Sequence, residues 1–216
     1  MTEPAPVDTL VIDSATEACS VALVRDSTVI AGSCQMLGRG HAEALVPLIA
    51  TLPGKGRAAR IAVALGPGSF TGLRVGLAAA RALAFAWEAE LVGYPTLALI
   101  AAQARAAAGA QPVTVATTGG HGEWFVQDFS ADGLPLSPLA SLPPAAAAAR
   151  GGATLVAGSQ AEALVAARGS GQALPLWSDA RAFPLLPTAL LSATTDPLYG
   201  RAPDARLPGG IVAGTA

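Results

Sequence analysis

A run of three glycines and a proline joins a short apolar segment to a long stretch of helix-forming residues, and it is the segment most suggestive of chemistry. It reads Gly-Pro-Gly-Ser-Phe-Thr-Gly over residues 66–72, and Ser69 is placed to cap a helix that begins after it. Free N–H groups at a helix start attract anions, so the segment is a candidate phosphate cradle. The alternative is a tight strand-to-helix turn that serves packing alone. A P-loop would place Gly-Lys-Ser/Thr at the helix start, and no lysine follows here.

Asp13 ends an apolar segment and suggests a second way to bind a nucleotide. In sugar kinases and actin, a glycine-rich hairpin after the aspartate of the first strand wraps the phosphates. Here the turn reads Ser-Ala-Thr-Glu over residues 14–17, with no glycine for close backbone approach, and Glu17 places a carboxylate where phosphate would sit. The sequence therefore predicts a nucleotide-binding fold that has lost its phosphate site. Asp13 with Thr16 is interpreted as a strand-end turn.

Metal or nucleophilic catalysis needs grouped ligands or nucleophiles, and the sequence offers few. His41 and His121 have no second histidine at helical spacing, so a zinc site is not indicated. His41 is interpreted as a polar residue at a helix start or an interface. His121 lies in a glycine-rich loop, where Glu123 is its only acidic neighbour. A cysteine hydrolase that uses His41 would need a pairing that the sequence does not impose.

The two cysteines, Cys19 and Cys34, are too few for a disulfide framework. If residues 21–25 and 28–33 form a hairpin that turns at residues 26–27, the numbers of paired positions sum to 53, and the same sum pairs Cys19 with Cys34. The two thiols are therefore expected to face each other across adjacent strands. In a reducing cytoplasm, two free thiols are favoured over a disulfide.

Composition restricts the classes of function. The chain has 216 residues, enough for one or two domains with a substantial core, and a formal net charge of −2 from 13 basic and 15 acidic residues. This balance gives no general basic surface for binding nucleic acid, so we expect any contact with RNA to be made through another component. The start lacks the basic and apolar regions of a signal peptide, and no apolar stretch reaches membrane-spanning length. We expect a soluble, cytoplasmic protein.

An α/β fold must position these residues. Apolar segments bounded by charges and glycines predict a three-stranded meander followed by helices that alternate with strands, which is typical of a mixed sheet flanked by helices. The predicted strands cover residues 8–13, 19–24, 29–33, 61–65, 91–93, 112–116, 124–129 and 154–157, and the predicted helices cover residues 41–52, 70–88, 96–108, 145–149, 160–168 and 185–191. The expected parts are an N-terminal lobe over residues 1–108, a smaller C-terminal lobe over residues 109–202 and a loose tail over residues 203–216.

The helices predicted for residues 41–52 and 70–88 are apolar on more than one face. In the second helix, small residues recur every four positions and form a stripe that another backbone can approach closely: Gly72, Gly76, Ala80 and Ala84. Glycine weakens a helix by about 1 kcal/mol, so a gain in packing must offset it. A helix that is apolar nearly all round is buried on more than one side. The second cover is either the second lobe or a partner subunit, and the pattern alone does not choose between them.

Three segments together carry a resemblance to a known family. Residues 11–23 read VIDSATEACSVAL, residues 40–49 begin with Gly-His-Ala-Glu, and residues 66–76 read GPGSFTGLRVG. In this order they resemble the TsaB (YeaZ) family over residues 8 to about 105. Members of this family are the dimerisation subunits of the bacterial machinery that makes threonylcarbamoyladenosine in tRNA. The resemblance implies a two-lobed α/β fold of the actin-like ATPase (ASKHA) class, with mixed sheets flanked by helices.

The resemblance also implies a non-catalytic scaffold subunit with no cofactor. Its implied partners are the catalytic paralogue TsaD, which transfers the threonylcarbamoyl group to the adenosine next to the anticodon, and the ATPase TsaE. It would meet tRNA only through the complex and form a homodimer when alone. In the family, two helices of the first lobe pack against the equivalent helices of the partner, which favours a partner subunit as the second cover. Carried over to this sequence, the implied partner-binding residues are His41, Ala42, Leu45, Ile49, Gly72, Leu73, Val75, Gly76, Ala79, Ala80 and Leu83.

Two other functions stay open at this point. One is a metallopeptidase, because the wider family has carried a glycoprotease label, although the sequence lacks paired histidines. The other is residual nucleotide binding in the cleft between the lobes or at a subunit interface. The second half also departs from the family pattern, since Thr-Thr-Gly-Gly over residues 117–120 replaces an Ile-Asp-Ala-Arg-like strand end.

Overall fold

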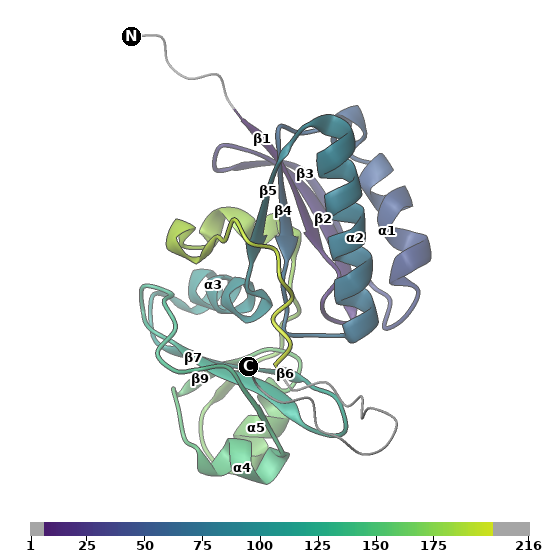
Figure 1. Ribbon diagram of the computed structural model, residues 1–216. Helices are drawn as coiled ribbons and strands as arrows, with labels where there is room; N and C mark the ends of the chain where they lie inside the picture. Colours follow the sequence, from purple (N-terminus) through teal and green to yellow (C-terminus); the bar gives the residue numbers. More distant parts are fainter. Residues whose placement is uncertain (1–6, 201–216) are drawn as a thin grey trace, which may run out of the picture.

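Apolar segments in the first half of the chain build a five-stranded sheet with helices on both faces (Figure 1). The computed structural model describes residues 7–200. The elements of this first lobe are, in chain order, β1 (Asp8–Asp13), β2 (Ala18–Arg25), β3 (Thr28–Met36), α1 (His41–Ala50), the 3₁₀ helix η1 (Pro53–Gly56), β4 (Arg60–Ala64), α2 (Phe70–Trp87), β5 (Glu90–Tyr94) and α3 (Thr96–Ala108). This order confirms the predicted meander followed by helices that alternate with strands.

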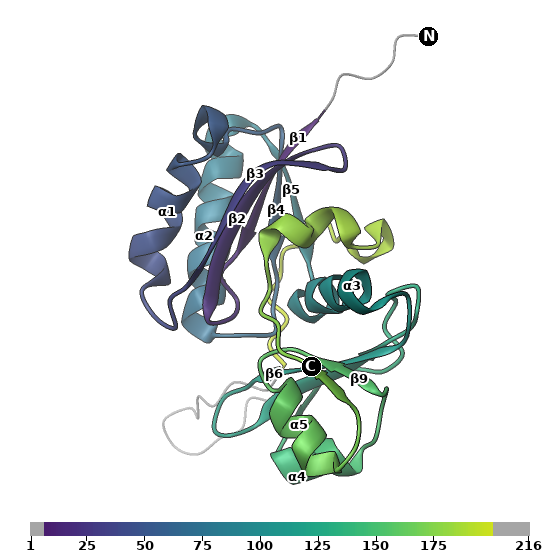
Figure 2. The ribbon, with the colours of Figure 1, turned by 180° about the vertical axis from the view of Figure 1, so that it is seen from behind.

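The first sheet has the strand order β3-β2-β1-β4-β5, with β1 at its centre. β1 pairs antiparallel with β2 and parallel with β4. Its apolar residues, Leu10, Val11 and Ile12, are fully buried because both faces of the sheet are covered. On one face, α1 and α2 lie side by side and enclose a core that includes Leu45 and Leu77 (Figure 2).

The helix α3 lies between the two lobes and is buried along most of its length (Figure 2). Leu97 and Ile100 of this helix share one core with Tyr94 of β5 and with Val113 and Phe129 of the second lobe. A continuous apolar core therefore spans both lobes.

The second lobe repeats the topology of the first. Its elements are β6 (Val113–Thr118), β7 (Trp124–Phe129), β8 (Ala140–Leu142), α4 (Pro144–Ala149), β9 (Leu155–Ala157), α5 (Ala161–Arg168) and β10 (Gln172–Leu174). Read from β8, the strand order is β8-β7-β6-β9-β10, and the first two pairs are antiparallel while the last two are parallel, as in the first sheet. A smaller core, with Val126, Val156 and Leu164, holds α4 and α5 against the outer face.

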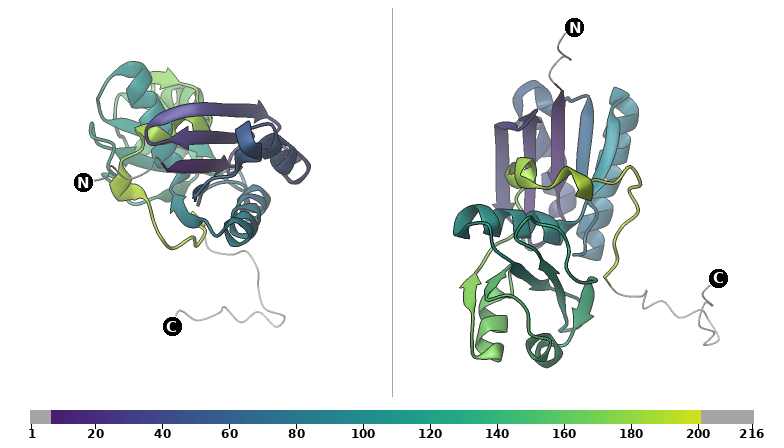
Figure 3. Two further views of the ribbon diagram at one scale, coloured as in Figure 1. Left: turned by 90° about the horizontal axis from the view of Figure 1, so that it is seen from above. Right: turned by 90° about the vertical axis from the view of Figure 1, so that its left-hand side faces the viewer.

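After β10 the chain returns to the first lobe. There η2 (Ala180–Leu185) lies against β2 and β3, and η3 (Thr188–Leu190) follows (Figure 3). The Gly93 N–H donates to the Ser192 carbonyl oxygen at 2.8 Å, and the Leu198 N–H donates to the Leu65 carbonyl oxygen at 2.7 Å. The end of the described chain thus covers the outer edge of β5.

The differences from the predicted elements have local causes. The predicted helix over residues 185–191 is wrong: Pro187 interrupts the segment, which holds only the end of η2 and the short 3₁₀ helix η3. β8 and β10 were not predicted, because each has only three residues and, unlike the equally short β9, neither is an uninterrupted apolar run. The predicted loose tail over residues 203–216 lies outside the described residues. Among residues 7–200, no helix has the length and apolar character needed to cross a membrane.

Candidate functional site

The glycine-rich segment joins β4 to α2 and packs directly on the turn between β1 and β2. A Cβ at Gly68 would lie 2.0 Å from the Ala15 carbonyl oxygen, and one at Gly72 would lie 2.1 Å from the Ser14 carbonyl oxygen. The Ser69 N–H donates to the Ala15 carbonyl oxygen at 2.7 Å, and the Ser14 hydroxyl donates to the Gly72 carbonyl oxygen at 2.8 Å. Ser69 caps α2, as predicted, by accepting from the Gly72 N–H. These two glycines therefore serve close packing between two turns of the same chain.

Asp13 forms the strand-end turn that the sequence predicts, but it is also fully buried. Its Oδ1 accepts from the Ala15 N–H at 3.0 Å, and its Oδ2 accepts from the Tyr94 hydroxyl at 3.2 Å. Burial raises the pKa of the Asp13 carboxyl to about 6, because desolvation of the charged form outweighs these hydrogen bonds. The pKa of the Tyr94 hydroxyl is raised by its own burial and by the Asp13 charge.

Hydroxyl groups next to Asp13 bind the segment that returns from the second lobe. The Thr16 and Ser178 hydroxyl oxygens lie 3.1 Å apart, and the Ser20 hydroxyl oxygen accepts from the Ala180 N–H at 2.9 Å. All three hydroxyl side chains are buried. The turn after β1 is therefore part of a polar contact between the first sheet and the returning segment.

A metal–triphosphate complex does not fit at this end of the molecule. The N–H groups that would bind phosphate already donate within the chain: Ala15 to Asp13, Ser69 to Ala15, and Gly72 to Ser69. The Asp13 carboxylate, which would face a metal, is enclosed and bonded to Tyr94. The interpretation of the glycine segment as a packing turn is thus supported over a phosphate cradle.

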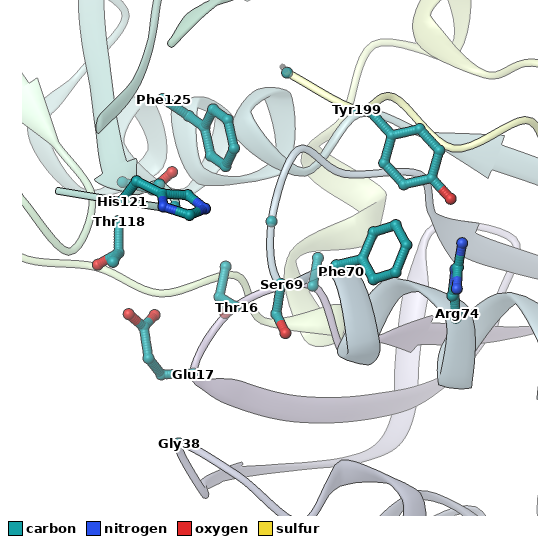
Figure 4. Close-up of a pocket in the computed structure, with 16 residues that line it drawn as sticks. Thr16, Glu17, Gly38, Ser69, Phe70, Arg74, Thr118, His121, Phe125 and Tyr199 are labelled. Carbon is teal, nitrogen blue, oxygen red and sulfur yellow. The ribbon is translucent and has the colours of Figure 1, made fainter. Parts of the chain in front are cut away.

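A cleft of about 790 Å³ opens between the lobes beside the turn that joins β1 to β2. Figure 4 shows His121 and Phe125 on one side of the cleft and Phe70 and Tyr199 on the other. The Phe70 and Tyr199 ring centroids lie 5.6 Å apart, and the Arg74 guanidinium carbon lies 3.6 Å from the Phe70 centroid. The cleft therefore has aromatic groups on both walls and one arginine.

The histidines take separate positions. His41 is the first residue of α1, as predicted for a helix-start residue, and its Nε2 lies 3.0 Å from the Thr16 carbonyl oxygen. His121 adopts a positive φ of 58° in the glycine loop between β6 and β7 and lines the cleft. Within the described part of the chain, no three His, Cys, Asp or Glu side chains are grouped so that they could hold a metal ion.

The expected pairing of the two cysteines is wrong. The hairpin turns after Arg25 as predicted, but the register shifts near Val24, where Ile30 is left as an extra residue on β3. Cys34 is therefore opposite Ser20, and Cys19 is one position further along, so the two thiols point to opposite faces of the sheet. Both cysteines are free, and burial raises the pKa of each thiol to about 11.

Most of the residues that the family resemblance assigns to partner binding lie in the chain's own core. Ala42 is exposed, Val75, Ala79 and Leu83 are half-buried, and the buried ones are His41, Leu45, Ile49, Gly72, Leu73, Gly76 and Ala80. The stripe of small residues that begins at Gly72 faces the first sheet, where a Cβ at Gly76 would lie 2.5 Å from the Ser14 hydroxyl oxygen. Its interpretation as a surface for another subunit is corrected: the close backbone belongs to the same chain.

A second set of small residues on α2 faces outward. Ala78, Ala82 and Ala86 also recur every four positions, and all three are exposed. They are offset by two residues from the buried stripe, which places them on the opposite side of the helix. With neighbouring apolar residues they form what we call the outer helix face: Ala42, Val46, Pro47 and Ala50 of α1, and Ala78, Ala82, Phe85 and Ala86 of α2. Sequence reasoning overlooked all of these except Ala42, although the second four-residue repeat is visible in the sequence.

Sequence comparisons match this chain to one family model and to two relatives. The family model for tRNA N6-adenosine threonylcarbamoyltransferase, TsaD, matches residues 35–136. The chain is 38% identical over 128 residues to the threonylcarbamoyladenosine biosynthesis protein TsaB of Escherichia coli, an alignment that covers 57% of this chain and 55% of that protein. It is 33% identical over 101 residues to TsaB of Bacillus subtilis, covering 44% of each chain. The aligned segments thus span about half the length of these relatives.

Solved structures match over more of the chain. A Pseudomonas aeruginosa protein described as similar to the peptidase YeaZ superposes with a TM-score of 0.67 at 26% identity, covering 81% of this chain and 87% of that one. YeaZ from the same organism gives a TM-score of 0.73 at 24% identity, covering 89% and 99%. The ethanolamine utilization protein EutJ of Carboxydothermus hydrogenoformans shares the fold alone, with a TM-score of 0.51, 13% identity and coverage of 86% and 91%. The duplicated sheets and the cleft between them define the actin-like ATPase (ASKHA) class. With this fold, the chain is similar in sequence to TsaB (YeaZ) proteins over about half of their length.

Proposed function

We propose that this chain is a non-catalytic scaffold subunit of the tRNA threonylcarbamoyladenosine machinery, which binds and stabilises TsaD in the cytoplasm. TsaD then modifies the adenosine next to the anticodon, TsaE is the ATPase of the same assembly, and tRNA contacts this chain through the complex. The names of the curated relatives support a role in this pathway.

The outer helix face is the observation that carries the proposal. Phe85 is 89% exposed and Val46 is 60% exposed, and five of the other six residues of the face are alanines. The same two helices also expose Glu43, Arg74 and Arg81. A group of exposed apolar residues of this kind is typical of a protein–protein interface. Small side chains also allow a facing helix to approach closely.

The match to the TsaD model supports TsaD as the partner. The matched residues, 35–136, include both α1 and α2, so the two families share this helix pair. Two related helix pairs can pack face to face about an approximate two-fold axis. A second copy of this chain would use the same surface, so the proposal includes a homodimer when TsaD is absent.

Reconstitution tests the proposal. A reconstituted threonylcarbamoyladenosine reaction that contains TsaD, TsaE and tRNA is assayed with and without this chain. We expect modified adenosine only when the chain is present and copurification of the chain with TsaD. Full modification without the chain, or peptide hydrolysis by the chain alone, would contradict the proposal. No specific observation favours the peptidase alternative.

A further inference from the structure

The two sheets have four edge strands in the described part of the chain, and three of these are protected from pairing with another strand. β8 and β10 have only three residues each. The outer edge of β5 is covered by the segment that returns from the second lobe, because the Gly93 N–H donates to the Ser192 carbonyl oxygen at 2.8 Å and the Ser192 N–H donates back at 2.9 Å. Short edge strands and covered edges are two ways in which proteins prevent unwanted strand pairing.

The fourth edge strand, β3, is long and open. It has nine residues and pairs with β2 alone, and within residues 7–200 no other element forms a hydrogen bond with its backbone. η2 packs across β1, β2 and β3, on a face of the sheet, and no element lies beyond β3 in the plane of the sheet (Figure 3). A row of unpaired backbone N–H and C=O groups at such an edge can bind another extended strand.

The residues of β3 present no obstacle to a further strand. Thr28–Met36 contains no charged residue and no proline, which are the usual protections of an exposed edge. Its one irregularity is the bulge at Ile30, and from Ala31 to Met36 the pairing with β2 is regular. Residues 31–34 have small, half-buried side chains, and residues 35 and 36 are exposed. We call residues 31–36 the open edge.

A second copy of this chain matches the open edge. A two-fold axis pairs a strand with itself in the antiparallel direction, and an uncharged strand meets no like charge in its copy. The charges at its two ends are complementary, because exposed Asp26 lies two residues before β3 and exposed Arg39 lies three residues after it. Antiparallel pairing therefore brings Asp26 of each copy to the end of the sheet where Arg39 of the other copy lies.

We propose that two copies of this chain pair antiparallel through their open edges and thereby join their first sheets into one continuous sheet. Ser33 and Cys34 lie in the middle of the open edge, so the two-fold axis passes close to them. Residue 33 of each copy then lies next to residue 33 or 34 of the other. This contact is separate from the outer helix face, which lies on α1 and α2, and it does not rest on the proposed function.

Sedimentation velocity of the full chain over a range of concentrations, without TsaD, tests the proposal. Every protein in the test carries Ala82→Arg, so that pairing through the outer helix face is suppressed. We expect a dimer in this background. Adding Ser33→Glu or Ser33→Lys should raise its dissociation constant at least about tenfold, because like charges then meet near the axis. Glutamate at the exposed position Ala145 of α4 is the matched control and should leave the dimer unchanged.

Mixing the two variants separates a lost contact from a misfolded chain. An equal mixture of the Ser33→Glu and Ser33→Lys proteins should restore the dimer, because opposite charges then meet at the same place. A dimer that is indifferent to both substitutions, or a mixture that stays monomeric, would overturn the proposal.

Hydrogen exchange of the backbone amides identifies the strand pairing itself. Protection of residues 31–36 should increase with protein concentration and should fall when Ser33→Glu is added. Protection that does not depend on concentration would assign the open edge to residues 201–216 of the same chain and overturn the second-copy assignment. A monomer with fast exchange at residues 31–36 up to high micromolar concentration would also overturn it. Because TsaD is absent from these assays, none of these outcomes affects the proposal that TsaD binds the outer helix face.

Discussion

Asp13 shows how a residue with the chemistry of a metal ligand can serve folding instead. Its carboxylate lies at the end of the central strand, where it accepts from the Ala15 N–H and the Tyr94 hydroxyl and is closed off from solvent. The sequence predicted the strand-end turn, because an aspartate after a buried strand readily bonds the backbone two residues on. It did not predict the enclosure, which depends on Tyr94 from β5 and on the distant segment around Ser178.

The raised pKa of Asp13 predicts how stability depends on pH. An acid whose pKa rises on folding, here from 3.8 to about 6, keeps its proton more tightly in the folded state. The contribution of the protonated Asp13 carboxyl to the free energy of unfolding is therefore fully present below about pH 4. It is lost as the pH rises through 6, a change of about 3 kcal/mol. Urea unfolding of wild type and Asp13→Asn between pH 4 and pH 8 measures this. We expect the free energy of unfolding of the variant to fall less over this range. Parallel curves for the two proteins would show that Asp13 does not titrate in this way.

The helix α2 illustrates what pattern can and cannot decide at the level of an element. Its boundaries were predicted to within a residue, because Ser69 marks the start and the apolar residues continue to Trp87. Which side faces inward was not predictable, since both sides carry small residues every four positions. The stripe with glycines lies inward because Ser14 approaches too closely for a Cβ at Gly72. The β-bulge that separates the two cysteines likewise has no sequence signal. Ile30, the extra residue, is an ordinary strand-forming residue between Val29 and Ala31, and nothing in the sequence marks it as unpaired.

Gly72→Ala measures this close approach. Alanine is the better helix former by about 1 kcal/mol, so a helix free of other contacts would gain stability. Here the new methyl group would meet the Ser14 carbonyl oxygen at 2.1 Å, and we expect a net loss of about 1–3 kcal/mol in the free energy of unfolding. Ala78→Gly, on the exposed side of α2, is the control. Its free energy of unfolding should fall only by the difference in helix propensity, about 1 kcal/mol. An increase in stability for Gly72→Ala would refute the packing role.

The whole molecule consists of two lobes with the same sheet topology, and α3 packs between them. The two lobes were predictable from the sequence to different degrees. The first lobe has strands of five or more residues with clear apolar runs, whereas β8 and β10, which were not predicted, have three residues each and pair at the two edges of the second sheet with β7 and β9. The return of residues 177–198 to the first lobe could not be predicted, because the contacts of Ser178 and Ser192 join residues about a hundred positions or more apart. The inner sides of α1 and α2 are buried against the first sheet, and their outer sides, which form the outer helix face, stay exposed in the described chain.

The affinity of this chain for TsaD, with a charge placed on the outer helix face, tests the central claim most directly. Ala82→Arg adds a long cation in the middle of the apolar surface, and Ala145→Arg adds the same side chain to an exposed position on α4 of the other lobe. Calorimetric titration with TsaD should show binding at least about tenfold weaker for Ala82→Arg, a loss of about 1.4 kcal/mol or more, and unchanged binding for Ala145→Arg. Both variants should unfold at the wild-type temperature. Wild-type affinity in a folded Ala82→Arg variant would contradict the assignment of α1 and α2 as the partner surface.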